Sequence, residues 1–227
     1  SSPSNPITIS AAQVASFIAD PSSFSGYSAE SYVIVTGEIT PAQASALNSV
    51  NAAYIQATIT AASISNLAGI AVSNSSRTSL NKFSFEVTDT SAKAADLNTI
   101  IDKTSISVDL SNVGVIETSD SAAITTLYTA STVGLGNEII NLSDTTINAQ
   151  ALNNINGYTT GVVVVTGASA VNGSAADLIA VYSANVAGTI TGLGNEAVTL
   201  SDSSIDAAVL ITLDAFTSGI INADNIT

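Results

Sequence analysis

The chain of 227 residues contains no cysteine, histidine, methionine or tryptophan. Without cysteine it forms no disulfide and offers no thiolate. Without histidine it lacks the most common general base and transition-metal ligand. Paired carboxylates, or a serine activated by lysine, are the remaining catalytic options, but none of the few lysines lies in a recognisable motif. The sequence therefore predicts a protein that is not an enzyme.

Basic residues are almost as scarce. Eighteen Asp and Glu residues face four Lys and Arg residues, which gives a formal net charge of −14. A surface of this sign repels phosphate backbones and anionic lipid, so we expect no nucleic-acid partner and regard cations as the plausible small ligands. The apolar residues are interrupted by Ser, Thr and Asn and never form the run of about 18 that a spanning helix needs. We therefore expect no membrane insertion.

What the chain does contain is an internal repeat. The sequence GLGNE at 134–138 recurs at 192–196, and the LSD of 142–144 recurs at 200–202, both 58 residues later. Equivalent strand ends at Thr36, Thr88, Ser143 and Ser201 are spaced 52, 55 and 58 residues apart. Repeats at such a period indicate stacked supersecondary units. The whole chain is predicted to be four degenerate copies of about 55 residues, each a double coil of two strand–helix pairs.

Apolar periodicity predicts strands and helices in alternation. The expected strands are 7–10, 32–39, 54–60, 83–88, 106–110, 138–142, 161–166, 196–200 and 219–222. The expected helices are 11–20, 41–50, 65–72, 92–102, 121–130, 148–156, 174–184 and 206–216. Thr40 and Pro41 give the clearest helix start, with a cap residue followed by a proline that needs no hydrogen bond.

Short connections between strands and helices favour parallel strands joined by right-handed crossovers. We therefore predict an α/β repeat solenoid, with a parallel sheet on one face and helices on the other. A closed or doubly wound α/β fold is the competing architecture, although it has no need of tandem copies. Residues 1–52, which hold every proline and an aromatic cluster, are expected to form a divergent N-terminal capping repeat. Residues 53–227 are expected to form the tandem repeats, with an uncapped C-terminal end.

The last expected strand ends in mid-repeat. We expect either that the chain is a piece of a longer array or that another molecule covers this strand. The predicted assembly edge consists of Gly219, Ile220, Ile221 and Asn222.

Acidic residues recur at equivalent places in the copies. Asp89, Asp144 and Asp202 follow strand ends, and Glu138 and Glu196 are shared by the last two copies. Stacked turns rich in Asp, Asn and Ser could supply the oxygens that Ca²⁺ prefers. Equally, each Asp could close an Asx-type turn or lie at a helix N-terminus, which requires no metal. Both interpretations stay open on the sequence.

The glycines of the two GLGN segments resemble a phosphate-binding loop only faintly, because a strand rather than a helix follows them. We expect them to be turn residues with positive φ. They are Gly134, Gly136, Gly192 and Gly194.

The segment GLGNExxxLSD, the AADL motifs at 94–97 and 175–178, and GYTTGV at 157–162 resemble repeats of very large bacterial surface proteins. Proteins of that kind are acidic, rich in Ala, Ser and Thr, and common in marine bacteria and cyanobacteria. The resemblance covers about the last 140 residues. It implies an exported structural or adhesive role, and it carries over no functional positions.

Together these features predict a non-catalytic structural module of an extracellular surface protein or self-assembling fibre. The expected location is the bacterial cell surface or a secreted fibre, and the expected partner is the protein itself or a neighbouring repeat. The alternative is a calcium-dependent adhesin or carbohydrate-binding module, whose partner would be a surface glycan.

Overall fold

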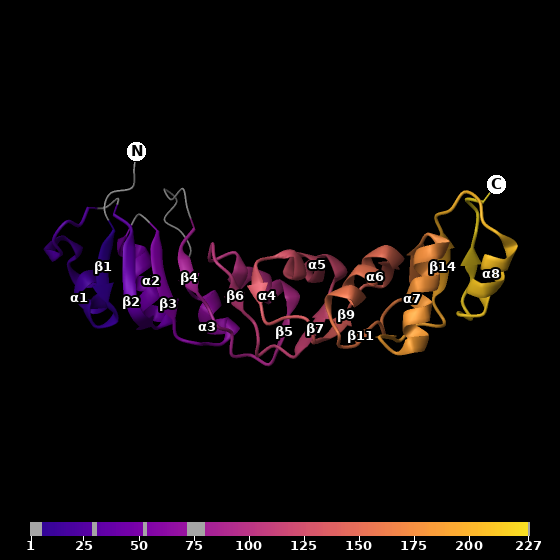
Figure 1. Cartoon of the computed structure of the whole chain (residues 1–227), viewed down its shortest axis with the longest axis horizontal. Helices are drawn as coiled ribbons and strands as arrows, with labels where there is room; N and C mark the ends of the chain where they lie inside the picture. Colours follow the sequence, from indigo (N-terminus) through magenta and orange to yellow (C-terminus); the bar gives the residue numbers. More distant parts are fainter. Residues whose placement is uncertain (1–5, 29–30, 52–53, 72–79, 227) are drawn as a thin grey trace. The chain divides into compact units, whose positions relative to one another are not determined.

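A computed structural model describes residues 6–28, 31–51, 54–71 and 80–226. Helices and strands alternate through all four ranges (Figure 1). Every strand pair among these residues is parallel. The prediction of an α/β protein with parallel sheets and interspersed helices is therefore confirmed.

The helices lie close to their predicted positions. The α-helices are α1 (Val14–Ala19), α2 (Pro41–Val50), α3 (Ile64–Ala68), α4 (Ala94–Ile101), α5 (Ser121–Thr129), α6 (Ala149–Tyr158), α7 (Ala175–Ala187) and α8 (Ala207–Asp214). Two short 3₁₀ turns, Ala11–Gln13 and Pro21–Ser23, flank α1. The end of the helix expected at 65–72 includes Val72, which lies outside the described residues.

The strands are shorter and more numerous than expected. They are β1 (Ile7–Ser10), β2 (Val33–Ile39), β3 (Ile55–Ile59), β4 (Lys82–Ser84), β5 (Ser91–Lys93), β6 (Val108–Asp109), β7 (Val115–Ser119), β8 (Thr132–Val133), β9 (Ile139–Leu142), β10 (Thr146–Asn148), β11 (Val163–Val164), β12 (Ala170–Gly173), β13 (Ile190–Thr191), β14 (Ala197–Leu200) and β15 (Ile221–Asn222).

The chain divides into two compact units. Unit 1 comprises residues 1–90, 96–113 and 130–134, and unit 2 comprises residues 91–95, 114–129 and 135–227. Unit 1 holds a sheet of order β1-β2-β3-β4 and a pair β6-β8. Unit 2 holds sheets of order β13-β11-β9-β7-β5 and β10-β12-β14-β15.

Each unit thus has two parallel sheets, where the sequence predicted a single sheet face. The difference arises at corners within extended stretches. Between β9 and β10 the chain turns at residues 143–145, so one stretch contributes a strand to each sheet of unit 2. The second strand of such a pair has only two to four residues, which is too short for hydrophobic alternation to reveal.

Local chemistry accounts for the helix starts. At α2, the backbone N–H of Gln43 donates to the Thr40 hydroxyl over 3.2 Å, and the Thr40 N–H donates to the Gln43 side chain over 2.9 Å. This reciprocal pair satisfies two backbone groups that the first helical turn leaves free. Pro41 at the first helical position completes the start, as predicted from the sequence.

The core is built from rows of aliphatic side chains. In β3, Ile55, Ala57 and Ile59 are buried while the residues between them face solvent. In α6, every third residue is buried, namely Ala149, Leu152 and Ile155. Each strand and each helix therefore contributes one apolar row, and burial of these rows is the main favourable term in folding.

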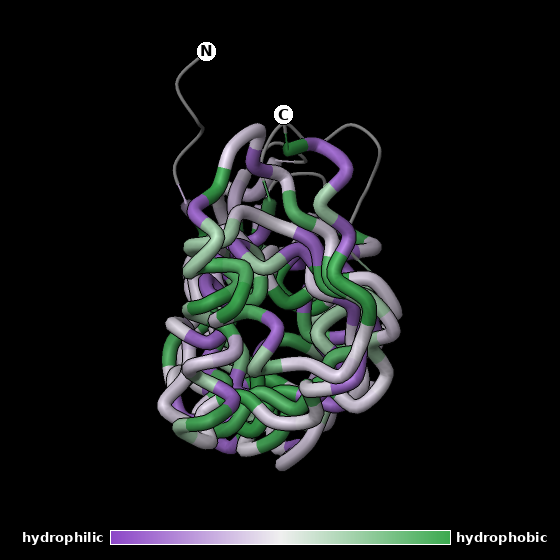
Figure 2. The backbone as a smooth tube through the Cα atoms, turned by 90° about the vertical axis from the view of Figure 1, so that its right-hand side faces the viewer, coloured by the Kyte–Doolittle hydropathy of each residue, from purple (hydrophilic) through white to green (hydrophobic). Residues whose placement is uncertain are grey.

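Hydrophobic stretches are short along the whole backbone and alternate with hydrophilic ones (Figure 2). Within the ranges that the structure describes, no helix has both the length and the apolar character needed to cross a membrane.

Candidate functional site: contacts between successive strand–helix segments

A buried glutamate organises the first GLGNE segment. Glu138 is fully buried, and its carboxylate accepts hydrogen bonds from the backbone N–H groups of Gly136, at 2.8 Å, and Asn137, at 3.2 Å. The hydroxyl of Tyr128, on α5, donates to the same carboxylate over 2.5 Å. The loop therefore folds around its own glutamate, and a side chain of the preceding helix completes the shell of donors.

The next segment closes over this loop. The hydroxyl of Thr159 donates to the backbone carbonyl of Glu138 over 2.7 Å, and the N–H of Thr160 donates to the carbonyl of Gly136 over 2.8 Å. Gly161 lies so close to Glu138 that a Cβ atom would overlap its carbonyl. Only glycine fits there without displacement of the backbone. We call Tyr128, Gly136, Glu138, Thr159, Thr160 and Gly161 the Glu138 cluster.

The same arrangement recurs around Glu196. Its carboxylate accepts hydrogen bonds from the Tyr182 hydroxyl and from the N–H of Gly194, the latter over 2.8 Å. Thr217 donates its hydroxyl to the Glu196 carbonyl over 3.0 Å, and the N–H of Ser218 donates to the Gly194 carbonyl over 2.9 Å. The Glu196 cluster comprises Tyr182, Gly194, Glu196, Thr217, Ser218 and Gly219.

The glycine prediction is confirmed. All four glycines of the two GLGN segments have positive φ: 89° at Gly134, 133° at Gly136, 95° at Gly192 and 132° at Gly194. These turns aim the Gly136 and Gly194 amides at the glutamates.

Burial, with a smaller contribution from Glu138, raises the pKa of the Tyr128 phenol well above its usual value. Burial and Glu196 act in the same way on the pKa of Tyr182. Both phenols therefore remain protonated donors. Each ring also stacks on an aromatic ring of the following segment, Tyr128 on Tyr158 and Tyr182 on Phe216, with centroid distances of 5.1 and 5.7 Å.

Unit 1 contains a reduced version of the cluster. The hydroxyl of Thr104 donates to the carbonyl of Phe83 over 2.7 Å, and the N–H of Ser105 donates to the carbonyl of Asn81 over 2.9 Å. Phe83 therefore occupies the place of Glu138. The backbone contacts persist without a carboxylate, so the contact between segments depends first on the threonine and the strand backbone.

The three aspartates act on the helices that precede them. Each carboxylate accepts a 2.7 Å hydrogen bond from the first backbone N–H of a helix 23 to 27 residues earlier: Asp89 from Ile64 of α3, Asp144 from Ser121 of α5, and Asp202 from Ala175 of α7. The Ser119 hydroxyl serves α4 in the same way, accepting from Ala94 over 2.9 Å. The helix N-terminus interpretation thus has direct geometric support, with the helix lying in the preceding segment.

The five acids considered for calcium fall into two kinds of place. The aspartates lie at the corners beside helix N-termini, whereas Glu138 and Glu196 lie inside their loops. All five carboxylates already accept backbone N–H groups. Within the part of the chain that the structure describes, no group of three or more acidic side chains is arranged to hold a metal ion. Calcium binding remains a prediction from the sequence.

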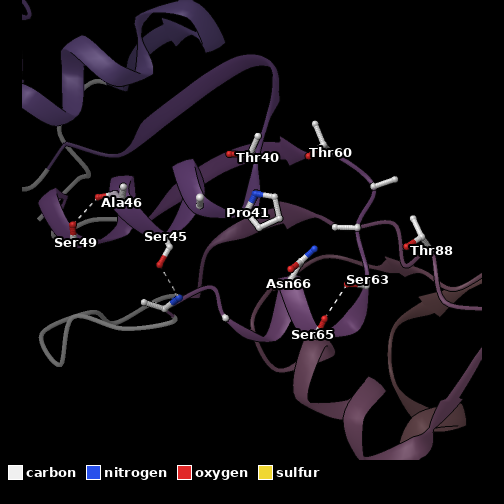
Figure 3. Close-up of a pocket in the computed structure, with 15 residues that line it drawn as sticks. Thr40, Pro41, Ser45, Ala46, Ser49, Thr60, Ser63, Ser65, Asn66 and Thr88 are labelled. Carbon is white, nitrogen blue, oxygen red and sulfur yellow. Dashed lines mark hydrogen bonds between the residues drawn. The ribbon is translucent and has the colours of Figure 1, made fainter.

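A groove of about 1160 Å³ runs beside α2 and α3 in unit 1 (Figure 3). Small side chains hollow it out, and hydroxyl and amide groups line it, including Thr60, Asn66 and Thr88. Ser45 accepts a 3.3 Å hydrogen bond there from the N–H of Ala71. None of the 15 lining residues is acidic or basic. Such a groove offers neutral hydrogen-bonding groups between small apolar surfaces.

The four predicted edge residues have different roles. Ile221 and Asn222 form β15 at one edge of its sheet, where Ile221 is paired with Val198. Ile220 precedes the strand and is 79% exposed. Gly219 belongs to the Glu196 cluster, because its N–H donates to the Thr217 hydroxyl and it packs against the Glu196 carbonyl.

Sequence reasoning missed the tyrosines and threonines of the two clusters. The signal was present, since Thr159-Thr160-Gly161 recurs as Thr217-Ser218-Gly219 at the period of the GLGNE repeat. The contacts and the fold together define an α/β protein of parallel strands whose successive segments are joined by repeated polar clusters. Comparisons with protein-family models, with curated proteins and with solved structures found no match.

Proposed function

We propose that the chain is a non-catalytic structural module of an extracellular surface protein or fibre. In this proposal the strand–helix segments stack as a solenoid, and stacking continues end to end through the strand β15. The repeat period, the parallel register and the two glutamate clusters support stacking within the chain. The acidic, cysteine-free composition and the resemblance to bacterial surface repeats support the location.

The observation that carries the proposal is a difference between two equivalent helices. In α6, Leu152 is fully buried and Asn153 donates a 3.0 Å hydrogen bond to the Asp177 carbonyl of the following helix, α7. The residues 58 positions later in α8 are Leu210, which is half-buried, and Ile211, which is 72% exposed. The face that another segment covers in α6 is therefore open and more apolar in α8.

An open apolar helix face beside an edge strand favours association with another segment. The test is sedimentation velocity over a range of protein concentrations, followed by negative-stain electron microscopy of the largest species. We expect assemblies that grow with concentration and shrink in the variant Ile211→Asn, which installs the α6 residue. Val133→Asn is the matched control, because Val133 is 50% exposed and lies in unit 1. A monomer at every concentration contradicts the proposal.

The groove of unit 1 favours a second candidate, the calcium-dependent adhesin or carbohydrate-binding module. Its uncharged hydroxyl and amide lining suits a neutral sugar better than an ion. The test is titration calorimetry against neutral oligosaccharides, with Ca²⁺ and with chelator. Saturable binding that the variants Asn66→Leu and Thr60→Val weaken supports this candidate. Binding that these variants leave unchanged places any sugar site elsewhere.

A further inference from the structure

We propose that two copies of the chain join through the same face, α8 and β15 of one copy against α8 and β15 of the other. This inference rests on the proposed function, because it names the partner of the end-to-end contact. The competing arrangement places β15 of one copy against β1 of the next and continues indefinitely.

The first observation is the chemistry of the α8 face. The α6 residues Ala149 and Leu152 are fully buried, whereas their equivalents in α8, Ala207 and Leu210, are exposed and half-buried. Ile220 adds a side chain that is 79% exposed just before β15. The replacement of Asn153 by Ile211 removes the polar group that bonds the following helix in the interior of the repeat. An apolar surface of this kind needs an apolar partner.

The second observation is that the other end offers no such partner. Among the described residues from 6 to 71, no large apolar side chain is exposed. Phe17 of α1 is fully buried and its ring meets those of Phe24 and Tyr27 at centroid distances of 5.1 and 5.3 Å. The edge strand β1 ends in the polar residue Ser10. The described part of the N-terminal segment is therefore sealed, and the face that best complements α8 is a second α8.

The third observation concerns the backbone. Val198 N–H donates to the Ile220 carbonyl over 2.8 Å, which is the pattern of a parallel pair centred on Ile221. In that pattern the N–H and C=O of Ile221 itself point away from β14. A second β15 related by a two-fold axis can pair with these groups in antiparallel orientation. The interface is then self-complementary and closed.

Charge opposes the contact and gives it a signature. Asp206 and Asp214 bound α8, and Asp224 follows β15, so a paired face brings like charges together. Salt screens such repulsion. The dimer is therefore expected to tighten as the ionic strength rises.

The absence of cysteine makes the test clean, because a single introduced thiol is unique. Ile220→Cys is treated with a short bismaleimide, and we expect a covalent dimer whose yield increases with salt. Ser10→Cys, at the end of β1, is expected to give none. Adding Ile211→Asn to Ile220→Cys should abolish the dimer, whereas adding Val133→Asn should not. Circular dichroism shows whether each variant retains its fold.

The outcomes separate the two proposals. If mixing Ile220→Cys with Ser10→Cys yields a crossed product while Ile220→Cys alone yields none, the copies join head to tail. That result overturns this inference and leaves the proposed function standing. If neither thiol cross-links and the chain sediments as a monomer at every concentration, both proposals fail.

Discussion

The hydroxyl of Tyr182 donates a hydrogen bond to the carboxylate of Glu196, 14 residues further along the chain. Glu196 is 2% exposed and pairs with no basic side chain in this contact. Its charge is held by the phenol and by backbone N–H groups, the nearest belonging to Gly194. Hydrogen bonds of this kind to an ionised group are stronger than neutral ones. The pair ties α7 to the loop before β14.

Removal of the phenol should therefore weaken the fold. We expect Tyr182→Phe to lower the free energy of unfolding by about 1.5–3 kcal/mol, because a hydrogen bond to a buried charge is lost. The measurement is urea denaturation followed by circular dichroism. Tyr158→Phe is the control, since Tyr158 contributes a stacked ring to the Glu138 cluster. Equal losses in the two variants would show that the hydroxyl of Tyr182 contributes nothing specific.

Alkaline pH should act on the same tyrosines. Burial raises the pKa of Tyr182 in the folded state, whereas the unfolded residue ionises near pH 10. The stabilisation is therefore complete below about pH 10 and is lost above it, with a slope of about 1.4 kcal/mol per pH unit for each such tyrosine. Burial also lowers the pKa of Lys103, but this effect is common to the wild type and to Tyr182→Phe.

The measurement is the free energy of unfolding of both proteins from pH 8 to pH 11. The wild type should lose stability faster than Tyr182→Phe above about pH 10. Parallel curves would contradict the assignment of the linkage to Tyr182.

Gly161 gives a steric test. A methyl group there would overlap the Glu138 carbonyl, so we expect Gly161→Ala to cost about 3 kcal/mol or to shift the backbone. Gly157→Ala is the matched control, since a Cβ at Gly157 meets nothing within 4 Å. Because Gly157 lies in α6, its replacement should be neutral or stabilising by roughly 0.5–1 kcal/mol. Thermal unfolding of both variants is the measurement, and similar melting temperatures would contradict the close packing.

The aspartates predict a stability loss at a distance in sequence. Asp144→Ala should cost about 1–2 kcal/mol, because the first amide of α5 loses its partner. Asp214→Ala should be neutral or slightly stabilising, since Asp214 is exposed at the C-terminal end of α8, where a negative charge is unfavourable. Hydrogen exchange at the start of α5 is the most direct measurement. Unchanged exchange in Asp144→Ala would contradict the capping role.

The same variant addresses calcium. If the aspartates also bind Ca²⁺, adding the ion should raise the melting temperature of the wild type and raise that of Asp144→Ala less. If they act only as caps, Ca²⁺ should shift both proteins equally.

Long periodic elements could be predicted from the sequence because their pattern is local. The helix at 41–50 and the strand at 7–10 have the predicted bounds, and each predicted helix has a counterpart within a few residues. The short strands β5, β8, β10, β12 and β13 could not be found in the same way. A strand of two to four residues shows no period, and its pairing is fixed by the neighbouring segment.

The polar contacts show the same division. The repeat located Asp144 and Glu138, and turn chemistry gave the positive φ of Gly136. What the aspartate binds could not be predicted, because its partner, Ser121, lies 23 residues earlier and meets it only after the segments stack. Tyr128 was likewise hidden, since its contact with Glu138 requires the orientation of α5.

The position of Asp202 has a consequence for biosynthesis. Helix α7 begins at Ala175, but the carboxylate that accepts its first amide is synthesised 27 residues later. The same delay applies to α3 and α5. During translation each of these helices would remain incompletely capped until the following segment had emerged and folded against it. The order of synthesis would thus set the order of folding, with each segment stabilised by its successor.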